Sequence, residues 1–199
     1  GALNRNSTSR ANQVGPEEYG FRANAKNLDL NRDFIKCDSD NAKAFAQLYH
    51  LWKPHVFIDT HTTNGADYQP TLTLLSSFTD KLVPMQATFV QREMTPYLFE
   101  KMEDLGDEMI PYVNLIGRTP DEGLSAFLDY PRYGSGYVSL FNTIAFLTEA
   151  HMLKPFDQRV ASTLNFLKVM HGFLTSRNEI MIKLKNLADA KTAEQKSFA

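Results

Sequence analysis

Residues 142–150 have the sequence NTIAFLTEA and residues 55–59 have the sequence HVFID, and these two apolar runs set the architecture that we expect. Neither run alternates between apolar and polar residues, which is typical of central strands that are buried on both faces. Apolar residues recur with helical spacing in residues 42–52, before the first run, and in residues 160–174, after the second. This pattern predicts an α/β fold, with a mostly parallel or mixed sheet flanked by helices on both faces.

The rest of the chain gives weaker signals. We expect a short strand in residues 71–75, a helix in residues 94–105 and a long loop in residues 116–136, which are rich in glycine, proline and charge. Residues 179–199 are charged and rich in alanine, which indicates a peripheral helix or a linker. Residues 1–178 are therefore expected to form one domain.

Composition excludes some classes of partner. The chain has 199 residues, of which 43% are hydrophobic and 22% charged, an ordinary balance for a globular core. Its formal net charge of -2 leaves no basic excess for a phosphate backbone, so we expect no nucleic-acid partner. No apolar run approaches the roughly 18 to 20 residues of a membrane-spanning helix, so we expect no membrane partner. One cysteine, Cys37, cannot form an internal disulfide, and the compartment stays open.

A histidine and a glutamate lie at the ends of the two apolar runs. His61 follows HVFID in the sequence DTHTTNG, where it can act as a metal ligand or a general base. The alternative is a loop histidine hydrogen-bonded to Asp59 or to a threonine. Glu149 ends the run IAFLT, where burial raises the pKa of a carboxyl towards the range of a general base. The alternative is a glutamate that has reached solvent at the end of its strand.

A third cluster occupies residues 27–34, NLDLNRDF. Asp29, Asn31 and Arg32 alternate with leucines, as along a short strand. A guanidinium beside an amide forms a clamp for a carboxylate. The alternative is that Arg32 forms an ion pair with Asp33 or Asp29.

Together and in this order, the three clusters resemble the zinc carboxypeptidase family, the carboxypeptidase A/B-like metallopeptidases, over about residues 4–154. LDLNRDF is similar to the family's segment ending in Asn-Arg-Asn-Phe. His61 in IDTHTTNG looks like its third zinc ligand, and Glu149 in FLTEAH looks like its catalytic glutamate. The resemblance implies a metallocarboxypeptidase-like hydrolase that removes C-terminal residues from peptides, with residues 1–178 as a partial catalytic domain.

The resemblance also implies a role for each matched residue. Asn31 and Arg32 would bind the free C-terminal carboxylate of a peptide, and His61 would bind zinc. Glu149 would accept a proton from the attacking water and deliver it to the leaving amine.

Three further residues have weaker matches. Asp29 looks like the aspartate that orients the family's first zinc-binding histidine. Arg10 would polarise the scissile carbonyl, and Tyr133 would be the mobile tyrosine that closes over substrate. The alternatives are Arg22 for the arginine, and Tyr130 and Tyr137 for the tyrosine.

The chain departs from the family at its first metal-binding motif, His-x-x-Glu. No histidine is followed three residues later by an acidic residue: the residues at that spacing after His50, His55, His61, His151 and His171 are Lys53, Ile58, Asn64, Lys154 and Leu174. We therefore expect zinc in a complete parent protein, and weak or no zinc binding and no activity in this chain alone.

The sequence opens with GALNRNSTSR, without an initiator methionine, so we expect a piece of a longer protein that lacks the N-terminal strands of the family's sheet. Another copy of the chain, forming a homo-oligomer, would then cover the exposed sheet edge.

Two other functions fit the same residues. One is a zinc amidohydrolase of the desuccinylase and aspartoacylase kind, whose pattern also contains an Asn-Arg pair, a later zinc histidine and a glutamate base. The other is a non-catalytic peptide-binding module, which a parent without the His-x-x-Glu motif would favour. The residues do not indicate a compartment, and the resemblance alone favours a periplasmic or secreted protein.

Overall fold

The computed structural model describes residues 12–18 and 20–196 and contains one four-stranded sheet. Its strands, in spatial order, are β1 (Val56–Thr63), β6 (Ile144–His151), β2 (Leu72–Ser76) and β3 (Met109–Pro111). β1 is parallel to β6 and β2 is parallel to β3, whereas β2 and β6 are antiparallel. The predicted α/β architecture is thus confirmed as a mixed, mostly parallel sheet packed against helices.

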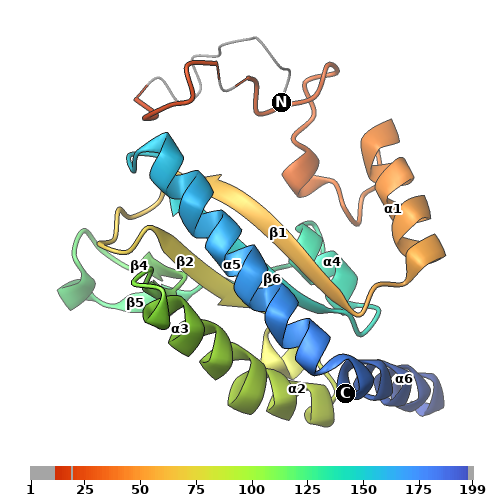
Figure 1. The fold of residues 1–199 in the computed structure, drawn as a ribbon. Coiled ribbons are helices and arrows are strands. Elements are labelled where there is room, and N and C mark those ends of the chain that lie inside the picture. The colour runs from red at the N-terminus through yellow and green to blue at the C-terminus, as the bar shows by residue number, and fades with distance from the viewer. Residues whose placement is uncertain (1–11, 19, 197–199) are drawn as a thin grey trace.

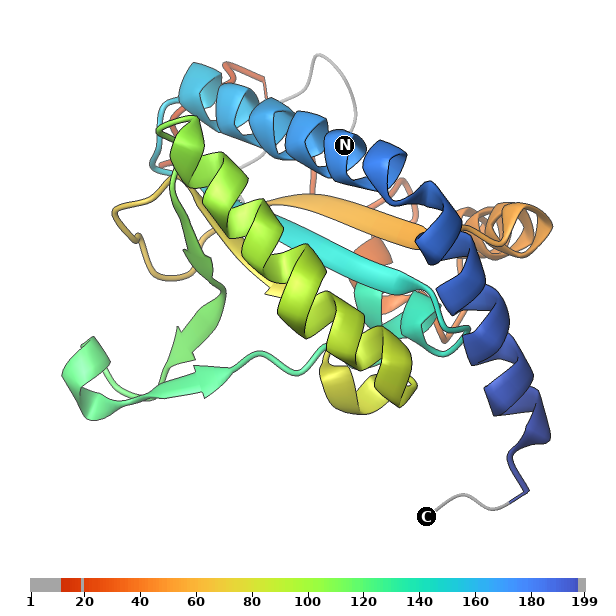
Figure 2. The same ribbon diagram turned by 60° about the horizontal axis from the view of Figure 1, so that its bottom comes forward.

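Four helices lie on one side of this sheet (Figures 1 and 2). They are α2 (Pro84–Phe89), α3 (Thr95–Asp104), α5 (Phe156–Ser176) and α6 (Asn178–Glu194), with a short π-helical segment, Val90–Met94, between α2 and α3. Helix α6 packs against α2 and α5. The apolar core lies between these helices and the strands, with Phe146 and Phe166 completely buried in it. No helix in the described residues is long and apolar enough to cross a membrane.

The opposite face of the sheet packs against two other helices, α1 (Asp40–Trp52) and α4 (Gly134–Ser139). An aromatic cluster fills the space between them and the strands. Its members include Phe45, Tyr49, Phe57, Tyr137 and Phe141. Residues 57, 59 and 61 of β1 share this face because successive side chains in a strand alternate between faces. The carboxyl end of β1 therefore presents polar side chains beside this aromatic layer.

The helix boundaries follow local sequence signals. The Ser39 hydroxyl accepts a hydrogen bond from the Ala42 N–H and caps α1, and Lys53 ends it with a left-handed backbone ahead of Pro54. Pro155 precedes the first residue of α5, as its fixed φ favours. Helix α6 extends to Glu194, so most of the segment expected to be a peripheral helix or a linker is helical.

The long loop predicted for residues 116–136 is wrong in part. β4 (Val113–Leu115) pairs with β5 (Leu124–Ala126) in a small antiparallel sheet, and the 3-10 helix η4 (Pro120–Glu122) lies between them. A capping box between Thr119 and Glu122 stabilises that turn. The side chains of β5 are exposed, so the strand has no buried apolar face to create a sequence signal.

Candidate functional site

Two residues of the predicted site are direct neighbours on adjacent parallel strands. His61 on β1 is paired in register with Glu149 on β6. The His61 Nδ1 atom lies 3.6 Å from Glu149 Oε1, and its Nε2 atom lies 2.8 Å from Asp59 Oδ1. The prediction of a loop position for His61 is wrong: β1 pairs with β6 as far as Thr63, because ladder hydrogen bonds hold the polar residues THTT in the strand.

The environment of His61 favours its charged form. Burial alone disfavours the imidazolium, but the hydrogen bond and the charge of Asp59, together with the charge of Glu149, outweigh it and raise the pKa of His61. The predicted hydrogen bond to Asp59 is therefore present. Such a carboxylate on one imidazole nitrogen also orients the other nitrogen, as it does behind metal-binding histidines.

Asn31 and Arg32 lie in a 3-10 helix, η1 (Leu30–Arg32), and not along a strand as predicted. The reason is local: the Asp29 carboxylate accepts a hydrogen bond from the Asn31 N–H at 3.0 Å, which stabilises a turn in place of an extended chain. Arg32 donates to the Asn31 carbonyl oxygen at 2.6 Å, and its Cζ lies 4.7 Å from the centre of the Tyr133 ring. The Asn31 Oδ1 atom is buried and has no hydrogen-bond partner within the described residues.

The carboxylates next to Arg32 are occupied by other groups. Asp29 forms an ion pair with Arg22 at 2.9 Å, and Asp33 accepts from the N–H groups of Asp38 and Ser39 at 3.0 and 2.9 Å. The alternative of an ion pair from Arg32 to Asp29 or Asp33 is therefore wrong. The role of Asp29 in orienting a zinc-binding histidine stays a prediction.

These groups meet in one pocket of about 150 Å³. Its lining residues are Arg22, Asn31, Arg32, His61, Thr62, Thr63, Asn64, Tyr112, Phe127, Tyr133, Leu147 and Glu149. The structure thus brings together residues from η1, from both parallel strands and from the segment before α4. Arg10 lies outside the described residues, whereas its alternative, Arg22, lines the pocket.

The three candidate tyrosines differ in position. Tyr133 lines the pocket, whereas Tyr130 is 53% exposed. Tyr137 belongs to the aromatic cluster, and its hydroxyl oxygen lies 3.2 Å from His50 Nε2. Sequence reasoning missed Tyr112, which follows β3. Burial raises the pKa of Tyr112, and the charge of Glu149 adds to the effect.

The described residues contain no group of three His, Cys, Asp or Glu side chains that could hold a metal ion. His61 and Glu149 together supply one nitrogen and one carboxylate, whereas a catalytic zinc typically has three protein ligands. The donor set in this part of the chain therefore does not fit a catalytic zinc ion.

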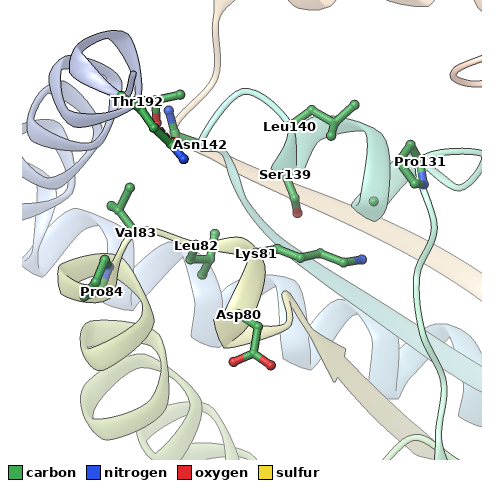
Figure 3. Close-up of a pocket in the computed structure, with 12 residues that line it drawn as sticks. Asp80, Lys81, Leu82, Val83, Pro84, Pro131, Ser139, Leu140, Asn142 and Thr192 are labelled. Atoms are coloured by element: carbon green, nitrogen blue, oxygen red, sulfur yellow. Dashed lines mark hydrogen bonds between the residues drawn. The ribbon is translucent and has the colours of Figure 1, made fainter. Parts of the chain in front are cut away.

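A second, larger cavity of about 580 Å³ lies between η2 (Thr79–Lys81), α4 and the end of α6 (Figure 3). Several of its polar groups already bond to other protein groups. Ser139 donates to Ser135, Thr192 donates to Asn142, and Lys81 pairs with Asp129, which is completely buried. This cavity therefore presents fewer open polar groups than the smaller pocket.

Comparisons with protein-family models, with curated proteins and with solved structures found no match to this chain.

Proposed function

We propose that this chain carries the carboxylate-binding and proton-transfer groups of a metallocarboxypeptidase-like site, which acts on the free C-terminus of a peptide in the complete parent protein. The observation that carries the proposal is that Arg32 faces the same small pocket as His61 and Glu149. A cation that holds a terminal carboxylate near a proton-transfer group makes cleavage specific for the chain end.

The groups around Arg32 support its role as a carboxylate clamp. Among the described ion pairs, none uses Arg32, and its Cζ atom lies over the buried ring of Tyr133. This cation–π contact restrains the side chain, so that less side-chain entropy is lost on binding. The buried amide of Asn31 retains hydrogen-bonding capacity beside it. A peptide end, which has both a carboxylate and an amide N–H, matches this pair.

The position of Glu149 supports a role in proton transfer. Its side chain is 14% exposed and lies at the carboxyl end of β6, next to His61. In the proposed reaction, Glu149 accepts a proton from the water that attacks the scissile carbonyl and passes it to the leaving amine nitrogen. Arg22, the alternative to Arg10, lines the same pocket and would stabilise the developing oxyanion.

A zinc ion in the complete site would take His61 as one ligand and would need further ligands from residues outside this chain, because the described donor set alone does not fit it. The present donor set favours a second candidate, a peptide-binding module without catalysis, because the described residues hold no three-ligand group. Both candidates bind a terminal carboxylate through Asn31 and Arg32. Only the first candidate hydrolyses the peptide.

The clamp is tested by calorimetric titration of the 199-residue chain with N-acetylated dipeptides that have free or amidated C-termini. We expect the free acid to bind more tightly, and Arg32→Ala to weaken its binding by about 2 to 4 kcal/mol, because the ligand carboxylate loses a desolvated partner. Glu149→Gln should leave this preference intact. Equal binding of acid and amide would refute the clamp.

Turnover is tested in the complete parent protein. We expect release of C-terminal amino acids from peptides and loss of this activity in Glu149→Gln with folding retained. Faster deacylation of N-acyl amino acids would favour the amidohydrolase alternative, and no turnover of either class would favour the non-catalytic module.

We also propose that a second copy of this chain covers β1. Among the described strands, β1 has a hydrogen-bonded neighbour on one side only. Helices α1 and α5, on either side of β1 in Figure 1, expose apolar residues that include Leu51, Trp52 and Leu164. Light scattering over a concentration series should show self-association, and a monomer at all concentrations would exclude the second copy as the cover.

A further inference from the structure

Two guanidinium groups approach the same tyrosine ring at the edge of the pocket. The Cζ atoms of Arg32 and Arg132 lie 4.7 and 4.8 Å from the centre of the Tyr133 ring. Arg132 also donates a hydrogen bond to the Tyr133 hydroxyl at 2.8 Å. The two charges can therefore be no farther apart than the sum of these two distances.

Neither of these arginines has a carboxylate partner among the described ion pairs, whereas Arg22, on the same pocket, is paired with Asp29. Two like charges around one ring repel each other, and cation–π contacts offset this only in part. A ligand with two carboxylates would relieve the repulsion. Arg32 lines the pocket and would bind one carboxylate, and the exposed Arg132, which contacts the lining residue Tyr133, would bind the other.

The segment that carries Arg132 is held firmly. Lys81 forms an ion pair with the completely buried Asp129 and also bonds to its carbonyl oxygen. On the other side, the Phe34 N–H donates to the Arg132 carbonyl oxygen at 3.4 Å, which joins this segment to the one that follows Arg32. The backbone of Arg132 is thus held at a defined position relative to Arg32. The Arg132 side chain extends from that position.

We propose that Arg132 determines specificity, by selecting peptides whose C-terminal residue is acidic. The inference rests on the proposed function, because it assigns the peptide's α-carboxylate to Arg32. The side-chain carboxylate of a C-terminal glutamate, joined to the α-carboxylate by a short carbon chain, then pairs with Arg132. Tyr133 contacts both cations and keeps them within reach of one ligand.

Calorimetric titration of the 199-residue chain with three ligands tests this proposal: N-acetyl-glycyl-glutamate, N-acetyl-glycyl-glutamine and the α-amide of the glutamate peptide. The glutamate peptide should bind about tenfold more tightly than the glutamine peptide. Arg132→Gln should remove this difference and leave binding of the glutamine peptide unchanged. Arg132→Lys should retain part of the preference, and Arg92→Gln, an exposed arginine on the segment between α2 and α3, is the matched control without effect.

The outcomes separate the two proposals. If the α-amide binds as tightly as the free acid, the clamp itself fails. If the free acid is preferred but the glutamate and glutamine peptides bind alike, only the role of Arg132 is overturned. The role of Arg132 is also overturned if Arg132→Gln weakens the binding of the glutamate peptide and of the glutamine peptide equally. That result indicates a general loss of structure or of positive charge. Circular dichroism of each variant checks that folding is retained.

Discussion

The strand half of the pocket, His61 and Glu149 with Asp59 bound to His61, differs from the loop half, Asn31, Arg32 and Tyr133, in what holds it in place. The strand half lies on two paired parallel strands, where register alone makes His61 and Glu149 neighbours. The loop half depends on a 3-10 turn, side-chain caps and one buried ion pair. The strand half is held by many backbone hydrogen bonds between the two strands, whereas the loop half depends on few contacts. Single substitutions should therefore disturb the structure of the loop half more than that of the strand half.

The largest effect is expected at Gly136, in the first turn of α4. A Cβ atom at this position would lie 2.2 Å from the Asp129 carbonyl oxygen and 2.3 Å from that of Tyr130. Both are backbone atoms and cannot swing aside, so Gly136→Ala should lower the free energy of unfolding by about 3 kcal/mol. Urea denaturation followed by circular dichroism measures this value.

Gly172 on α5 is the matched control, because a Cβ atom there would meet nothing within 4 Å. Gly172→Ala should stabilise the protein by about 0.5 to 1 kcal/mol through the helix propensity of alanine. Equal effects of the two substitutions would contradict the tight packing of α4 on the loop half.

A smaller effect is expected at Asp33, which follows η1 and connects it to α1. A hydrogen bond from the Ser39 side chain, together with the N–H groups of Asp38 and Ser39, holds the pKa of Asp33 below its ordinary value despite burial. Asp33→Asn loses acceptor capacity for one of these donors and should cost about 1 to 2 kcal/mol at neutral pH. Asp38→Asn, which alters an exposed ion pair with Lys36, should cost less than about 0.5 kcal/mol.

The pH dependence gives a second measurement at Asp33. Because its folded pKa is lowered, the carboxylate contributes stability above its ordinary pKa and loses it as the pH falls through the folded value. The stability difference between the parent chain and Asp33→Asn should therefore shrink on acidification. A difference that is constant with pH would show that the charge of Asp33 is not involved.

The sequence predicts the strand half better than the loop half for a physical reason. HVFID and IAFLTEA are dense in apolar residues because residues of both strands pack against the core clusters on both faces of the sheet, and parallel pairing then brings their carboxyl ends together. The expected central position is confirmed for β6 and is wrong for β1, which lies at the edge of the described sheet. The continuation of β1 through THTT was missed, because polar residues in a strand are held by the ladder and leave no apolar signal.

The loop half is determined by contacts that no local pattern encodes. Asp29 and Asn31 alternate with two leucines, yet the Asp29 cap places residues 30–32 in a 3-10 helix. Tyr112 and Phe127 reach the pocket because they flank the small sheet of β4 and β5, whose exposed strand has no periodicity. The ion pair between Lys81 and Asp129 joins distant segments and is equally invisible in sequence.

The smallest effect on stability is expected in the strand half itself. Asp59→Asn should lower the raised pKa of His61 because it removes the nearest charge, at 2.8 Å, and Glu149→Gln should lower it less because that carboxylate is 3.6 Å away. A raised pKa means that protonated His61 contributes stability below its ordinary pKa and loses it as the pH rises through the folded value. The change in unfolding free energy should be on the order of 1 kcal/mol or less, since the ladder keeps both side chains in place. Proton NMR titration of the metal-free chain measures the pKa of His61. A larger change from Glu149→Gln than from Asp59→Asn would mean that the imidazole is oriented mainly by β6.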